Sequence, residues 1–193
     1  MHRNPQRKTL AILASTVLLV GMALRANATT MVRMDLDQLT AAASTVARVR
    51  CLSNEWRVEE GTAWTITTFE VLETLKGSAP HRITVRLVGG RSGNLRVRVE
   101  GVPRFEIGEE AYLFLEPNRA GELTVTSWAQ GTFRVHRPSP RVELVTQDTG
   151  GVSMFDPQTK QYRAGGVRNL PLAEFKQRVS EAVERLRQKG LTQ

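Results

Sequence analysis

The apolar run Ala111-Tyr112-Leu113-Phe114-Leu115 follows the turn sequence Gly108-Glu109-Glu110. A strand with one buried face alternates apolar and polar residues, and this run does not alternate. The run therefore predicts a strand that is buried on both faces. We expect residues 111–115 to form the central strand of the domain.

Shorter strands are predicted on both sides of this run. Their apolar residues alternate with polar ones, which is the pattern of a half-buried strand. Strands of this kind are centred on Ile83, Val85 and Leu87, on Leu95, Val97 and Val99, on Leu123 and Val125, and on Phe133 and Val135. About six or seven short strands with little helix predict an all-β domain. We expect a mainly β fold, a small antiparallel OB-like barrel, with a β-sandwich as the alternative.

Two strands are predicted near the start of the domain, and in the second one the apolar residues change from one side of the strand to the other. Val46–Leu52 has β-like composition, and Trp64, Ile66 and Thr68 place alternate residues on one side of the next strand. At Phe69 the apolar residues move to odd-numbered positions, whereas those named before it occupy even-numbered ones. One extra residue produces such a change, so we expect a bulge here. Strongly bent strands of this kind are typical of small barrels.

Helices are predicted at both ends of the domain. Leu36, Leu39 and Ala43 stand at helical spacing and predict one or two helical turns. Near the C-terminus, Pro171 lies in the first turn of an amphipathic helix that we expect to pack on the barrel. A membrane-surface helix is the alternative, but the polar side carries both signs of charge. The apolar stripe consists of Leu172, Phe175, Val179, Ala182, Val183 and Leu186.

Residues 1–28 have the three parts of a secretory signal peptide. Arg3, Arg7 and Lys8 are basic, Leu10–Leu24 is an uncharged apolar run, and Ala26-Asn27-Ala28 is a cleavage sequence. The apolar run has 15 residues, whereas a membrane-spanning helix needs about 20. We therefore expect a periplasmic or secreted protein without a transmembrane segment after cleavage.

The mature chain then begins near Thr29. We expect a barrel core over 29–137, an extension or hairpin across the barrel over 138–168, and the C-terminal helix over 169–190. Cleavage removes four of the 27 lysines and arginines and none of the 19 acids, so the net charge falls from +8 to +4. So small a charge on an exported protein argues against nucleic acid as a partner.

Cys51 is the sole cysteine of the chain, so no internal disulfide can form. We expect its side chain to be buried on a strand, with a reactive or intermolecular thiol as the alternative. His81 and His136 stand 55 positions apart, and no histidine pair has metal-ligand spacing. Ser92 lacks the G-x-S-x-G context of a catalytic serine. No metal or cofactor site is predicted.

Asp148-Thr149-Gly150 has the sequence that carries the catalytic aspartate of aspartic proteases. That chemistry needs two such aspartates, and here the triplet occurs once. We interpret it as an ordinary turn. The sequence therefore shows no assembled catalytic group.

Arginines are concentrated between residues 82 and 104, where six of them occur: Arg82, Arg86, Arg91, Arg96, Arg98 and Arg104. The period of two places Arg96 and Arg98 on one face of a strand. One interpretation is a solvated face whose charges discourage edge-to-edge association. The other is a surface for an anionic envelope polymer or an acidic exported protein. Arg86, Arg91, Arg96 and Arg98 are the candidate binding residues.

These observations favour an exported, non-catalytic binding or accessory module of the cell envelope. The alternative is a hydrolase whose carboxylates are scattered in sequence and gathered by the fold. Such an enzyme would show a deep pocket containing two acids with displaced pKa values.

A set of short motifs resembles a family of exported bacterial proteins over most of residues 36–180. The motifs are Phe69–Gly77, Gly89-Gly90, Gly101–Phe105 with Gly108-Glu109-Glu110, Phe114-Leu115 and Gln130–Phe133. They consist of turns and core residues, and the resemblance implies no activity.

Phe69–Gly77 is also similar, more distantly, to the netrin-like domain of tissue inhibitors of metalloproteinases, which implies an OB-type barrel. Those inhibitors act through an N-terminal cysteine and several disulfides. This chain has Thr29 at its expected mature terminus and one cysteine, Cys51. The resemblance therefore implies the barrel architecture and not the inhibitory mechanism.

Overall fold

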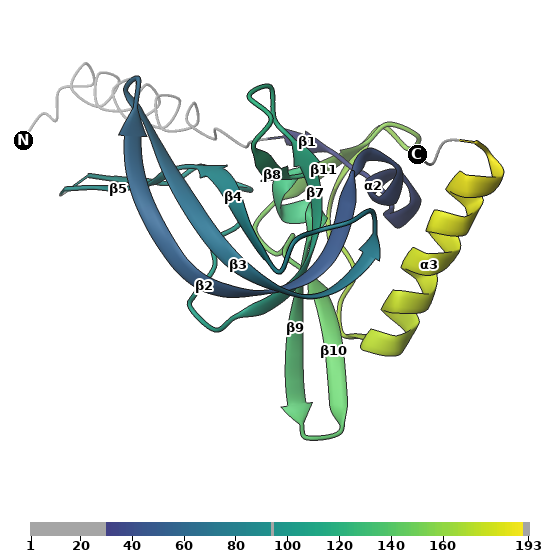
Figure 1. The fold of residues 1–193 in the computed structure, drawn as a ribbon. Helices are drawn as coiled ribbons and strands as arrows, with labels where there is room; N and C mark the ends of the chain where they lie inside the picture. Colours follow the sequence, from purple (N-terminus) through teal and green to yellow (C-terminus); the bar gives the residue numbers. More distant parts are fainter. Residues whose placement is uncertain (1–29, 94, 191–193) are drawn as a thin grey trace, which may run out of the picture.

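The computed structural model describes residues 30–93 and 95–190. Within these residues the chain is mainly β, with a short helix near the start and a long helix at the end (Figure 1). In chain order the elements are β1 (Thr30–Val32), α2 (Leu36–Ala42), β2 (Thr45–Glu59), β3 (Thr62–Lys76), β4 (Arg82–Val88), β5 (Gly90–Ser92), β6 (Leu95–Val97), β7 (Glu110–Pro117), β8 (Leu123–Val125), the 3-10 helix η1 (Trp128–Gly131), β9 (Thr132–Ser139), β10 (Val142–Gln147), β11 (Ser153–Asp156), β12 (Gln161–Ala164), β13 (Leu170–Pro171) and α3 (Leu172–Gln188).

Five strands close into a barrel-like ring in the order β7, β2, β3, β4, β8 and back to β7. All neighbours in the ring are antiparallel except β4 and β8, which meet in parallel at Val85 and Leu123. The predicted mainly β class is confirmed, and the ring is consistent with a small OB-like barrel. The ring sheet closes on itself through β8, whereas the alternative, a β-sandwich, would consist of two separate facing sheets.

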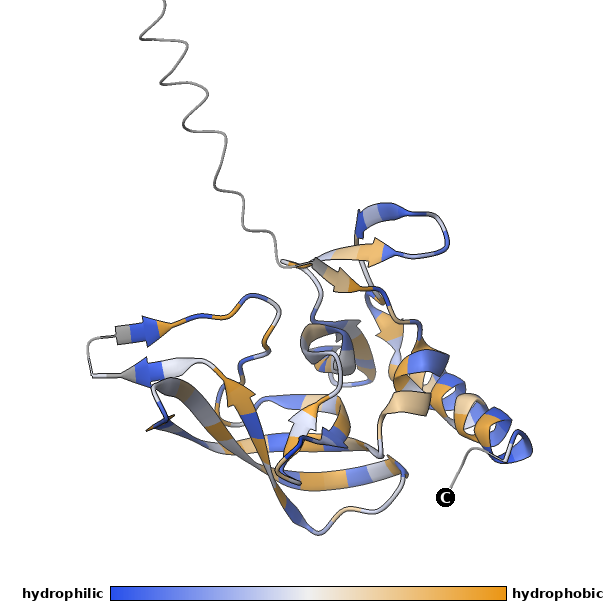
Figure 2. Cartoon of the chain, turned by 90° about the horizontal axis from the view of Figure 1, so that it is seen from above, coloured by the Kyte–Doolittle hydropathy of each residue, from blue (hydrophilic) through white to orange (hydrophobic). Residues whose placement is uncertain are grey.

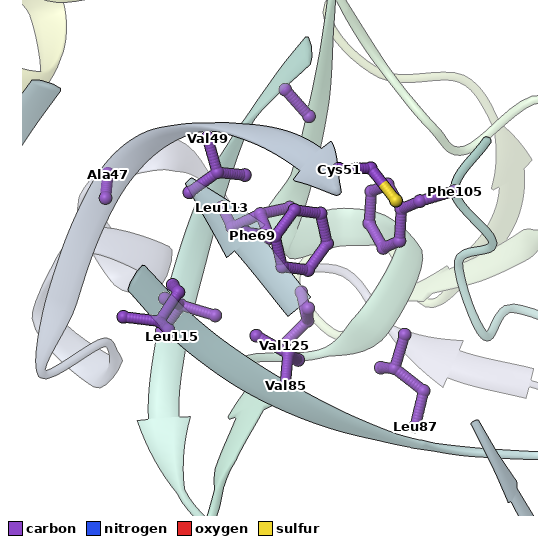
Figure 3. Close-up of a cluster of buried hydrophobic side chains, with 12 residues drawn as sticks. Ala47, Val49, Cys51, Phe69, Val85, Leu87, Phe105, Leu113, Leu115 and Val125 are labelled. Carbon is purple, nitrogen blue, oxygen red and sulfur yellow. The ribbon is translucent and has the colours of Figure 1, made fainter. Parts of the chain in front are cut away.

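β7 is buried on both faces, as its unbroken apolar run predicts. Ala111, Leu113 and Leu115 point into the ring, where Figure 3 shows Leu113 close to Phe69 of β3. Tyr112 and the phenylalanine two positions after it point to the opposite face. One strand therefore contributes to two separate hydrophobic cores.

The second core lies between the ring and the two helices. Phe175 of α3 is fully buried, and its ring centroid lies 5.0 Å from those of Tyr112 and Phe133. Leu39 of α2 belongs to the same core. Figure 2 shows hydrophobic and hydrophilic residues interspersed along α3, and the buried ones are those of the predicted stripe apart from half-buried Leu186. Both predicted helices are therefore confirmed, and α3 packs on the ring.

The register between β2 and β3 is irregular at three places. Near Phe69 the extra residue lies in β2, whereas Leu72 and Leu75 of β3 have no opposite residue further along the strand. Along β3 the buried residues Ala63, Thr67 and Phe69 keep one parity. The register between β2 and β3 shifts where Cys51 faces Phe69, because Leu52 of β2 has no opposite residue. At Phe69 the extra residue was expected in β3, because the order of apolar and polar residues along β3 carries no information on an extra residue in the neighbouring strand β2.

The C-terminal part of the sheet extends beyond the ring. β9 and β10 form a hairpin that projects from the domain (Figure 1), and β10 also pairs with β13. β11 and β12 form a second hairpin, which pairs in parallel with β1. This small sheet joins the start of the described chain to residues more than 120 positions later.

The predicted signal peptide, residues 1–28, lies outside the described residues. In the part of the chain that the structure describes, no helix combines the length and the apolar character that crossing a membrane requires.

Candidate ligand-binding cleft

A cleft of about 280 Å³ lies at one end of the ring, between the inner faces of β2 and β3 and the segment 97–105. Leu87, Val97 and Phe105 give it an apolar lining. Trp56 stands beside them with 56% of its surface exposed. The cleft can therefore receive an apolar group next to an exposed aromatic ring.

The glycine-rich segment after β4 forms one wall of the cleft. Gly90 has a φ of +145°, and a Cβ there would lie 2.9 Å from Cδ1 of Trp56 and from Oγ1 of Thr65. Only glycine allows the chain to pass so close to these side chains. Gly90–Ser92 pairs with Leu95–Val97, so part of this segment is itself a strand.

Arg91 and Arg96 lie directly opposite each other in this β5–β6 ribbon, and both line the cleft. Like charges in opposite positions of an antiparallel pair are destabilising. Neither guanidinium forms an ion pair with a carboxylate among the described residues, and Arg91 donates only to the carbonyl oxygen of Gly93, at 3.3 Å. An anion bound between them would remove this repulsion.

The polar groups at the base of the cleft bind each other. Thr67 donates its hydroxyl hydrogen to Oδ1 of Asn54 at 2.7 Å, and Nδ2 of Asn54 donates to the carbonyl oxygen of Phe105 at 2.8 Å. Phe105 in turn packs edge-on against Phe69, with ring centroids 5.0 Å apart. These contacts fix the 97–105 segment against the ring.

Arg86, a predicted binding residue, lies outside the cleft. Its guanidinium stacks 4.2 Å from the centroid of the Trp64 ring and pairs with Glu59 and Glu122. Only 17% of the Arg86 side chain is exposed. Its charge is therefore balanced within the protein.

Arg98 lies beyond the end of β6, 71% exposed and 3.8 Å from Glu100. It lines a second hollow of about 220 Å³, to which Arg96 does not contribute. Arg96 and Arg98 therefore line different hollows, and the strand on which they were expected to share a face ends at Val97. Arg104, which was not among the predicted binding residues, lines both hollows.

The second hollow contains the aspartate of the Asp-Thr-Gly sequence. Asp148 accepts a hydrogen bond of 2.7 Å from Arg134, which also pairs with Glu109. Burial opposes the charge of Arg134, but its hydrogen bonds to the two carboxylates outweigh it and raise the pKa. Asp148 is thus paired within the protein, and it lies in the bend that follows β10.

The most strongly perturbed carboxylate lies away from both hollows. Burial disfavours the ionised form of Glu110, but hydrogen bonds from Arg137, Arg50 and Arg48 outweigh it and lower its pKa to about 2. Among the described residues no Asp or Glu lines the cleft, and no cluster of three His, Cys, Asp or Glu side chains could hold a metal ion.

Sequence reasoning identified Arg91 and Arg96 but missed Trp56 and Arg104. Trp56 lies in a polar stretch of β2 where a large aromatic residue has no local structural reason, and this was the available signal. The position of Arg104 depends on a loop without periodicity. Comparison with models of protein families and with curated protein sequences found no match for this chain.

Proposed function

We propose that the protein is an exported, non-catalytic binding module of the cell envelope whose cleft takes an acidic, amphipathic segment of another exported protein. The observation that carries the proposal is the facing pair Arg91 and Arg96 above an apolar lining. The arginines supply charge-assisted hydrogen bonds to a carboxylate. The apolar lining and Trp56 supply contact area for the side chain beside it.

An acidic protein segment fits this cleft better than an anionic polymer does. A regular polyanion presents charge along its whole length and would gain little from Leu87, Val97 and Phe105. The hydrolase alternative is less favoured, because no Asp or Glu among the described residues lines the cleft. Two carboxylates line the second hollow, but Asp148 pairs with Arg134 and Glu100 lies 3.8 Å from Arg98.

The binding chemistry can be tested with two dyes of nearly the same shape. 8-Anilinonaphthalene-1-sulfonate has an apolar body with one anionic group, and N-phenyl-1-naphthylamine has the same body without the sulfonate. We expect both dyes to bind the purified protein and the sulfonate dye to bind more tightly. The variant Arg91→Gln/Arg96→Gln should lose about tenfold in affinity for the sulfonate dye, which corresponds to about 1.4 kcal/mol.

Arg98→Gln is the matched control, because Arg98 is exposed and close in sequence but does not line the cleft. It should leave both affinities unchanged. The double variant should also leave the affinity for the neutral dye unchanged, which distinguishes lost charge from lost folding. Equal binding of the two dyes by the unaltered protein would refute the proposal, as would equal losses in Arg98→Gln and the double variant.

A further inference from the structure

The outer half of β2 has a hydrogen-bonding partner on one side only. β7 covers β2 over Thr45–Arg50, and the last backbone contacts on that side join Cys51 to Gly108 and Glu109. Beyond them, Ser53–Glu59 pairs with β3 and with no other described strand. Seven residues span about 23 Å of strand edge.

Two large apolar side chains lie along this edge. Trp56 is 56% exposed and Val58 is 52% exposed, and the period of two places both on the inner face of the strand. Such an edge readily pairs with another strand. Glu55, Arg57 and Glu59 occupy the opposite face.

We propose that this edge pairs with the same edge of a second copy of the chain, antiparallel and centred on Trp56. The charge pattern selects this partner and this register. With a two-fold axis at residue 56, Glu55 of each copy lies opposite Arg57 of the other, so two ion pairs form across the interface. Trp56 then faces Trp56 of the second copy. Each copy presents the same patch, as a closed two-fold dimer requires.

The neighbouring registers are disfavoured. Centring on residue 57 places Arg57 opposite Arg57 and Glu55 opposite Glu59, and centring on residue 55 places Glu55 opposite Glu55. Like charges in these positions are destabilising. If the axis instead passed between two residues, each inner-face residue of one copy would lie opposite an outer-face residue of the other. The apolar face and the charged face would then not continue from one copy to the next. Centring on Val58 shortens the pairing because the turn follows at Glu60.

The pairing uses groups that the single chain leaves exposed. Arg57 and Glu55 form an exposed ion pair within the strand at 3.0 Å, with exposed fractions of 57% and 61%. Each of these side chains can exchange its partner for the equivalent one of the second copy. Because Trp56 also lines the cleft, the dimer would bring two clefts together across the axis.

Charge exchange tests the register. We expect the unaltered protein to be a dimer in sedimentation equilibrium. Arg57→Glu alone and Glu55→Arg alone should each weaken the dimer by about tenfold, because both create two like-charge contacts. The variant Glu55→Arg/Arg57→Glu restores two opposite-charge contacts and should return the dissociation constant to within about threefold of the original.

A cross-link gives an independent readout. Opposite residues of an antiparallel pair have Cα atoms about 4.5–5.5 Å apart, within disulfide range. Under oxidising conditions Trp56→Cys should therefore form a covalent dimer, whereas Val58→Cys should not, since its two copies would be four residues out of register. A monomer at every concentration would overturn the proposal. So would a dimer that is indifferent to the single charge changes, or a double exchange that fails to restore association.

Discussion

Tyr112 donates its phenolic hydrogen to Oε2 of Glu73 across 2.8 Å, which links β7 to β3 on the side of the ring that α3 covers. Lys176 of α3 pairs with the same carboxylate. Burial, followed by the hydrogen bond to Glu73, raises the pKa of Tyr112. Burial opposes the charge on Glu73, but Lys176 and Tyr112 together lower its pKa. One half-buried carboxylate therefore joins two ring strands to the terminal helix.

Tyr112→Phe should lower the free energy of unfolding by about 1–2 kcal/mol, because a buried hydrogen bond to a charged group is lost without creating a large cavity. Urea denaturation measures this difference. Tyr162→Phe is the control, since Tyr162 is 63% exposed and should change stability by less than about 0.5 kcal/mol. Equal effects of the two variants would contradict the structural role of the Tyr112–Glu73 contact.

Glu110 should make stability depend on pH in the acid range. Its folded-state pKa of about 2 lies below the ordinary value of 4.5, so the unfolded chain binds the proton first as the pH falls. The stabilisation is complete above about pH 4.5 and is lost as the pH falls towards 2. Unfolding free energies measured across this range should decline.

Glu110→Gln should be less stable at pH 7 by about 1–3 kcal/mol and should show a shallower decline between pH 4.5 and 2. Arg48, Arg50 and Arg137 each lose one partner in this variant. Glu106→Gln removes an exposed carboxylate and controls for the change in net charge. The prediction is wrong if the acid decline keeps its full slope in Glu110→Gln.

Phe175 should be the residue of α3 on which docking of the helix most depends. It is fully buried against Tyr112 and Phe133, and its truncation to alanine should cost about 3–5 kcal/mol. Ile107→Ala removes a side chain that is 74% exposed and should cost less than about 0.5 kcal/mol. Thermal and urea unfolding of the two variants would check this contrast.

Gly131 ends η1 at a position where the backbone leaves no room for a side chain. A Cβ there would lie 2.1 Å from the carbonyl oxygen of Thr126. Gly131→Ala should therefore destabilise the protein by about 1–3 kcal/mol through forced movement of the backbone. Gly150→Ala is the matched control because no atom lies within 4 Å of its Cβ position. Similar unfolding midpoints for both variants would exclude this steric explanation.

Cys51 should be unreactive in the folded protein. Its side chain is 1% exposed, and burial raises the pKa of the thiol despite its contact with Asn54. A chromogenic aryl disulfide should react on the order of 100-fold more slowly with the native protein than with the urea-unfolded chain. Thr62→Cys supplies an exposed thiol that should react at once. Rapid native reaction of Cys51 would instead support the alternative of a reactive thiol.

The central strand and the two helices followed from the sequence because their signals are local. The run from Ala111 to Leu115 indicates burial on both faces without knowledge of the neighbours. The stripe from Leu172 to Leu186 likewise identifies the buried side of α3. Hydrophobic periodicity indicates which face of an element is buried, and about ten consecutive residues are enough to show it.

The ring closure and the cleft depend on contacts between distant residues, which no local pattern records. The parallel meeting of Val85 with Leu123 closes the ring. The bulge at Leu52 determines that Trp56 points toward the cleft, since one residue of register reverses the face of every later side chain.

The sequence by itself determined the β class, the central strand, the terminal helices and the presence of clustered arginines. Only the tertiary structure decided that Arg91 and Arg96 share a cleft, that Arg86 is neutralised by Glu59 and Glu122, and that Arg98 lies elsewhere. The physical reason is that charge is a property of a residue, whereas the field at a site depends on which groups the fold places within a few ångströms of it.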